Sequence, residues 1–113
     1  MNKLSEFVKD LIKRGIYVSN VDIRNGELAY DINGFAKSGT GTLFIEDGKI
    51  KLETRYKRID TIESLSDIVD VAYEWDYGYC NKNNIYTVYS VREGWMNLYK
   101  EFGKDTTIFG KYG

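Results

Sequence analysis

The sequence predicts an α+β domain with an N-terminal helix, a four-stranded antiparallel meander and two C-terminal helices packed on one sheet face. Three observations predict it: a helical apolar period at the start of the chain, two dipeptides typical of tight hairpins, and apolar stripes at helical spacing after residue 60. The chain has 113 residues, of which 42% are hydrophobic and 29% charged. Size and composition are those of one globular domain spanning residues 1–113.

Helices are predicted at both ends of the chain. Apolar residues at i, i+3 and i+4 spacing predict the first helix over residues 3–14. Two pairs, Asp60 with Glu63 and Ser90 with Glu93, match the capping box that opens a helix. Apolar stripes after them predict helices over 61–77 and 91–102. Residues 85–90 fit either a short strand or a helix continuation. Residues 104–113 fit either a docked arm or a frayed end.

The meander follows from two hairpin signals. Asn25-Gly26 and Asp47-Gly48 are typical of two-residue loops. Pairing across the first loop places Ile23 opposite Leu28, and pairing across the second places Ile45 opposite Ile50, so apolar residues share one face. The strands are therefore predicted over 16–24, 27–33, 35–46 and 49–57. The first helix and the hairpins are interpreted as scaffold, and residues 60–99 are expected to carry the working surface.

Composition excludes several kinds of site. Histidine is absent, which removes Ser-His-Asp triads, Cys-His pairs and Cys/His zinc sites. Cys80 is the one cysteine, so no internal disulfide can form and a reducing, cytoplasmic location is expected. No signal peptide or membrane span is predicted. A net charge of −1 provides no overall attraction to nucleic acid or anionic membrane. Neither a cofactor nor a metal is expected.

The stretch Ser38-Gly39-Thr40-Gly41-Thr42 is glycine-rich without matching a phosphate-binding loop. It lacks the spacing of GxxxxGK[ST] or GxGxxG, and it lies inside the meander, where no helix N-terminus follows. A bulged or close-packed strand is the favoured interpretation. The alternative is a small-ligand or nucleotide-binding module with a pocket formed by Gly39–Gly41 and nearby tyrosines.

The predicted helix 61–77 is acidic. From Asp60 to Asp76 there are six acidic residues and no Lys or Arg, and four of them recur at helical spacing: Glu63, Asp67, Asp70 and Glu74. Catalysis would need carboxylates in different environments, and a metal would need a closed cage, so neither is expected here. The stripe is either salt-bridged or solvated surface, or a docking face for a basic surface of another protein.

Aromatic residues crowd the same region, with six between Tyr73 and Tyr89. Tyr and Trp are frequent at interface hot spots. Stacking on nucleobases would need basic residues among them, so a protein partner is favoured over nucleic acid. The predicted partner-binding residues are Glu63, Asp67, Asp70, Glu74, Asp76, Trp75, Tyr77 and Tyr79.

The segment Thr54–Trp75, with the Trp95 helix and its Phe102-Gly103 end, resembles small bacteriophage-encoded accessory proteins over about half of the chain. The resemblance implies a phage or mobile-element protein that binds and inhibits a host protein, in the host cytoplasm; anti-CRISPR and anti-restriction inhibitors are similar in scale. It implies no catalytic residues. The expected function is therefore a non-enzymatic interaction domain for a host protein with a basic surface. A homodimer, and a dimeric secretion-chaperone-like client binder, stay open as alternatives.

Overall fold

A computed structural model describes residues 3–35, 39–54, 58–83 and 93–109. The helices are α1 (Lys3–Lys13), α2 (Leu65–Asn83) and α3 (Glu93–Glu101), followed by the short 3₁₀ helix η2 (Thr107–Phe109). One antiparallel sheet holds five strands in sequence order: β1 (Val18–Arg24), β2 (Glu27–Phe35), β3 (Gly39–Glu46), β4 (Lys49–Thr54) and β5 (Arg58–Ile62). The α+β class and the antiparallel sheet are confirmed.

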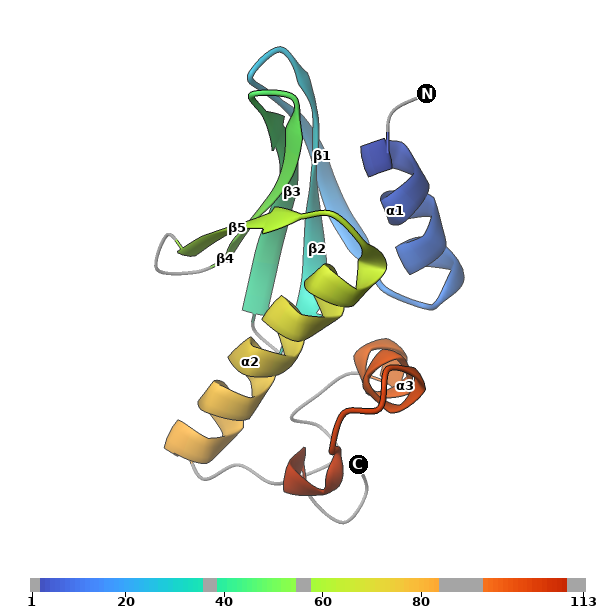
Figure 1. Cartoon of the computed structure of the whole chain (residues 1–113), viewed down its shortest axis with the longest axis vertical. Helices are drawn as coiled ribbons and strands as arrows, with labels where there is room; N and C mark the ends of the chain where they lie inside the picture. Colours follow the sequence, from blue (N-terminus) through green and yellow to red (C-terminus); the bar gives the residue numbers. More distant parts are fainter. Residues whose placement is uncertain (1–2, 36–38, 55–57, 84–92, 110–113) are drawn as a thin grey trace.

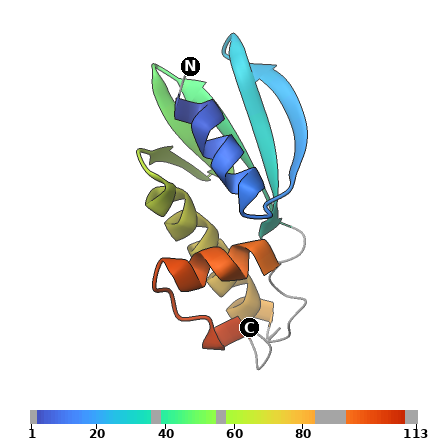
Figure 2. The same cartoon turned by 90° about the vertical axis from the view of Figure 1, so that its right-hand side faces the viewer.

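The helices divide between the two ends of an elongated molecule. In Figure 1, α1 lies along the sheet, with the hairpin turns at the top and α2 leaving the lower end of the sheet. Figure 2 shows α3 crossing α2 below α1. The prediction that both C-terminal helices cover one sheet face is therefore wrong in detail. The helix over the sheet is α1, while α2 and α3 pack on each other beyond the sheet's end.

Both hairpins have the predicted register. Ile23 pairs with Leu28 and Ile45 pairs with Ile50. Asn25 and Asp47 have φ angles of 55° and 53°, and the glycines after them have φ angles of 78° and 73°. Two consecutive left-handed residues define a type I′ turn, which suits the twist of the flanking strands.

A fifth strand, β5, occupies part of the chain that was predicted as the end of one strand and the start of a helix. It pairs with β4, so that Ile62 lies opposite Ile50. The Asp60/Glu63 capping box is wrong because a competing one forms four residues later. The Asp67 carboxylate accepts the backbone N–H groups of Glu63 (2.8 Å) and Ser64 (3.1 Å). The helix therefore begins at Leu65 and continues through Gly78 to Asn83.

The core lies between the sheet and the helices. Its helical members include Leu4, Leu11 and Ile68, which are at most 1% exposed, and Trp95 is the largest fully buried side chain. The Trp95 indole N–H donates to the carbonyl of Asn33 (3.0 Å), which ties α3 to β2. The predicted helix 91–102 is confirmed over its described part, which is α3. Of the open tail, Phe109 is docked at 1% exposure, whereas 110–113, like 85–90, lie outside the described residues.

The second face of the sheet is mainly polar and holds one buried aromatic ring. Phe44 on β3 is 0% exposed although it points away from the core. The Arg24 guanidinium carbon lies 3.6 Å from the centre of the ring, and Arg24 also forms an ion pair with Glu53 (2.7 Å). A cation held over an aromatic ring is attracted by it and shields it from water. The Arg24 side chain thus covers the Phe44 ring on this face.

α3 begins against the loop that follows α1. A Cβ added at Gly94 would lie 2.9 Å from the carbonyl oxygen of Gly15 and 3.0 Å from the Ile16 Cδ1 atom. Only a glycine permits this backbone approach. Gly78, in α2, has no atom within 4 Å of such a Cβ.

Two glycine-to-alanine substitutions should therefore have opposite effects on stability. We expect Gly94→Ala to lower the free energy of unfolding by about 1–3 kcal/mol, because the added methyl overlaps the Gly15 backbone. Gly78→Ala should raise it by about 0.5–1 kcal/mol, because alanine is the better helix former. Urea unfolding of both variants measures the difference. A Gly94→Ala variant as stable as wild type would contradict the close contact.

Candidate functional site

The acidic face predicted on α2 is largely neutralised within the chain. The Lys104 Nζ atom lies 2.5 Å from the Asp70 carboxylate, and Arg58 lies 2.6 Å from the Glu74 carboxylate. Hydrogen bonding to Glu74, and then to Asp60, raises the pKa of Arg58. Of the two interpretations of the stripe, the salt-bridged surface is what the structure shows for Asp70 and Glu74.

The other two carboxylates of the stripe differ from each other. Asp67 is half-buried and accepts the two backbone N–H groups at the start of α2, so its charge stabilises the helix N-terminus. Glu63 precedes the helix and is exposed. A partner could therefore reach Glu63, whereas contact with Asp67 would compete with the helix cap.

Asp76 does not belong to the exposed acidic face. It is 0% exposed, and its carboxyl group accepts a hydrogen bond from the Tyr99 hydroxyl. Its inclusion among partner-contacting residues is wrong because helical spacing puts it seven residues after Val69 and four after Ala72, both 0% exposed. The same spacing in the sequence indicates the buried side of the helix for Asp76, whereas its charge alone indicates the exposed side.

Three of the four described members of the aromatic cluster pack against the core. Trp75 and Tyr79 are half-buried against the core, and Tyr77 is 44% exposed. Tyr73 packs edge-to-face on Tyr99, with ring centres 5.3 Å apart, and burial raises the pKa of its hydroxyl. Two more members, Tyr86 and Tyr89, lie outside the described residues. Of the predicted cluster, Tyr77 offers the most exposed side chain among those described.

The glycine-rich stretch forms part of a close-packed strand. Gly39 and Gly41 are buried in β3, and Gly41 lies between Ile32 and Thr54 of the neighbouring strands. A cleft formed by the described residues lies elsewhere, at the other end of the same strand.

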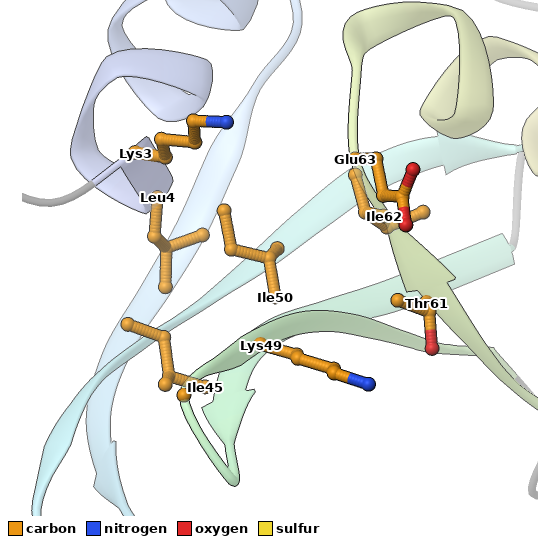
Figure 3. A pocket seen from close by; sticks show the side chains of 9 residues that line it. Lys3, Leu4, Ile45, Lys49, Ile50, Thr61, Ile62 and Glu63 are labelled. Carbon is orange, nitrogen blue, oxygen red and sulfur yellow. The ribbon is translucent and has the colours of Figure 1, made fainter.

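This cleft opens between the start of α1, the β3–β4 turn and the end of β5, and its volume is about 580 Å³. Figure 3 shows aliphatic side chains lining it, with charged and hydroxyl groups around them. The aliphatic residues are Leu4, Ile45, Ile50 and Ile62, and the polar ones are Lys3, Lys49, Thr61 and Glu63. An apolar lining with a few polar groups is typical of small-molecule sites of this size.

Exposed apolar side chains concentrate at the first hairpin. Tyr17, which precedes β1, is 65% exposed, and on the two strands Val21, Ile23 and Leu28 are 53%, 63% and 49% exposed. Val21, Ile23 and Leu28 are called the hairpin surface; Tyr17 lies on the opposite face, because it is next to the core-facing Val18 and its carbonyl accepts the Asn33 N–H (3.0 Å). The three are among the seven large apolar or aromatic side chains that are exposed in the described part of the chain. Apart from Tyr17, the others are Ile12, Ile59 and Tyr77, which lie on three separate elements.

The hairpin surface continues the core face of the sheet. Opposite residues of an antiparallel pair share a face, so Val21 points the same way as its partner Tyr30, which packs on the core. Figure 2 shows the hairpin extending past the end of α1. The alternation in the sequence indicates this apolar row, but it predicts a covered scaffold face and not an open surface. The signal for an open surface was the length of the helix, because about three turns cannot cover a long hairpin.

β1 is also an edge of the sheet. It is first in the strand order and pairs with β2 on one side. All seven of its residues are exposed or half-buried, and it contains neither Lys nor Pro. Of the usual protections of an edge strand, β1 has a bulge between Val18 and Asn20 and the charges of Asp22 and Arg24, but it lacks lysine, proline and shortness. The edge and the hairpin surface thus form one accessible region.

Comparison with known proteins gives no match: no family model, no curated protein and no solved structure is significantly similar to this chain. The described residues contain no group of three or more His, Cys, Asp or Glu side chains placed to hold a metal ion. Within the same residues, no helix has the length and apolar character needed to cross a membrane.

Removal of the hydroxyl that binds Asp76 should destabilise the fold. Tyr99→Phe takes away a donor from a carboxyl group at 0% exposure, so we expect a loss of about 1–3 kcal/mol in unfolding free energy. The matched control is Tyr73→Phe, whose hydroxyl donates to the more accessible Asp105 carbonyl (2.6 Å) and whose loss should cost about 0–1 kcal/mol. Urea unfolding at neutral pH compares them. Equal losses would show that Asp76 does not depend on Tyr99.

Proposed function

We propose that this protein is a small non-enzymatic protein-interaction domain that binds another polypeptide through its hairpin surface. The observation that carries the proposal is the concentration of exposed apolar side chains beside an open strand edge. A contiguous apolar patch on a small soluble domain marks a site of protein contact. Burying the exposed half of one aliphatic side chain contributes about 1 kcal/mol, so the hairpin surface offers several kcal/mol before the costs of association.

The acidic face of α2 offers less. A partner with a basic surface would have to displace Lys104 from Asp70 and Arg58 from Glu74, exchanging ion pairs that each contribute about 0–1 kcal/mol. Glu63 and Tyr77 are exposed and stay in the proposal as secondary contacts. Electrostatic complementarity there would affect the rate of encounter more than the affinity.

A host protein as the target, with inhibition as the outcome, is part of the proposal and comes from the resemblance to phage accessory proteins. It is supported by the Thr54–Trp75 segment and not by the hairpin surface. The two parts are separable, because the hairpin surface and α2 lie at opposite ends of the molecule in Figure 1.

A second candidate function, binding of a small molecule, is favoured by the cleft at the start of α1. Lys3 and Lys49 lie on its rim above an aliphatic lining. That combination suits a molecule with an anionic end and an apolar body.

Substitution of the hairpin surface should weaken capture of a protein partner. Ile23→Ser with Leu28→Ser removes about 2 kcal/mol of buried apolar contact, a roughly thirtyfold loss of affinity. The immobilised double variant is compared with wild type in a lysate of the native host. The control is Ile12→Ser with Ile59→Ser, two residues of similar exposure, 54% and 46%, elsewhere. Retention of the same proteins by the hairpin variant would refute the proposal.

Small-molecule binding predicts a specific thermal shift. Fatty acids and alkyl phosphates of medium chain length should raise the melting temperature by a few degrees through mass action. Lys3→Ala with Lys49→Ala should remove the shift, whereas Lys13→Ala with Lys100→Ala, two exposed lysines away from the cleft, should preserve it. Shifts that both double variants retain would place any binding outside the cleft.

A further inference from the structure

We propose that the hairpin surface takes up a second copy of this chain, by antiparallel pairing of the two β1 strands about Val21. This rests on the proposed function, because it names the polypeptide that the same surface binds. The two sheets would then continue into one another, with both apolar faces on the same side.

The turn geometry determines which backbone groups of β1 point outward. A two-residue type I′ loop closes on a hydrogen-bonded pair, here Arg24 with Glu27. Hydrogen-bonded and non-hydrogen-bonded pairs alternate along an antiparallel ladder, so Asp22 bonds toward β2 while Val21 and Ile23 direct their N–H and C=O groups away. The Ile23 N–H accordingly reaches the Asp22 carboxylate (2.7 Å) and not a strand.

Symmetry then selects the register. A two-fold axis perpendicular to the sheet keeps both apolar faces on one side and places one residue opposite its own copy, which can be Val21, Asp22 or Ile23. A centre at Asp22 would place two carboxylates directly opposite each other, which is unfavourable. A centre at Ile23 would bring Val21 against Asn25, in the turn of the second copy, whereas Val21 is the middle residue of Val18–Arg24. Val21 is therefore the centre.

The side chains in this register complement one another. Val21 meets Val21 of the second copy on the apolar face, which buries residues that are now more than half exposed. On the polar face Asn20 lies opposite Asp22 of the second copy, so an amide donor faces a carboxylate twice by symmetry. No like charges face each other. The other edge strand, β5, is shorter, with five residues against seven in β1, and shortness protects an edge from such pairing.

The test uses the fact that Val21 lies opposite itself. Sedimentation equilibrium of the full chain should show a dimer for wild type. V21K and V21E should each raise the dimer dissociation constant at least about tenfold, because like charges then face each other across the axis. An equimolar mixture of V21K and V21E should restore association to within about threefold of wild type, because opposite charges then pair.

Controls keep each outcome decisive. I59K and I59E, at an exposed position of β5, should leave the dimer unchanged and show no rescue on mixing. V21P provides a second route: the Val21 N–H points away from β2, so proline removes the outward donor and leaves the β1–β2 ladder. Circular dichroism verifies the fold of each variant.

Two results would overturn the inference: a wild type that stays monomeric at high micromolar concentration, or a dimer that V21K, V21E and V21P leave intact. A monomeric wild type whose Ile23/Leu28 variant still loses a captured protein would leave the proposed function standing with a different occupant. If that variant loses nothing, the proposed function fails as well.

Discussion

The Asn25-Gly26 turn determines the register of β1 against β2, and a shift of one residue would move every side chain of β1 to the other face. With the register as it is, Ile32 is buried at 0% exposure and Arg24 lies over Phe44 on the opposite face. The same turn determines which amides of β1 face β2 and which face solvent. The faces that the β1 side chains occupy and the accessible edge therefore both depend on two left-handed residues in sequence.

Local interactions explain which parts of the fold could be predicted. The two hairpins and α1 depend on residues within a few positions of each other, and their register and spacing were readable in the sequence. The start of α2 was not, because Asp60/Glu63 and Ser64/Asp67 are both acceptable caps. The choice between them depends on the pairing of Ile62 with Ile50 in β4. Tertiary pairing decided between two local signals of similar strength.

The candidate site was harder to predict for a related reason. Whether an acidic residue is available depends on what a distant segment brings to it. Lys104 and Arg58 reach Asp70 and Glu74 only because η2 and β5 pack beside α2. Charge alone likewise could not reveal that Asp76 lies under Tyr99, although its helical position did indicate the buried side. The exposed hairpin was missed because apolar alternation indicates a covered face without showing how far the cover extends.

The contact of Gly94 with Gly15 has a consequence for how the chain folds. The loop after the first helix and the first turn of the last helix lie against each other, and Trp95 bonds to a carbonyl in the second strand. These contacts join parts of the chain far apart in sequence, so the entropy of closing a long loop must be lost before they form. Neither end of the chain can bury its apolar face alone. The sheet with α1 and the helical end are thus expected to form one cooperative unit, whose late folding step is the docking of the last helix.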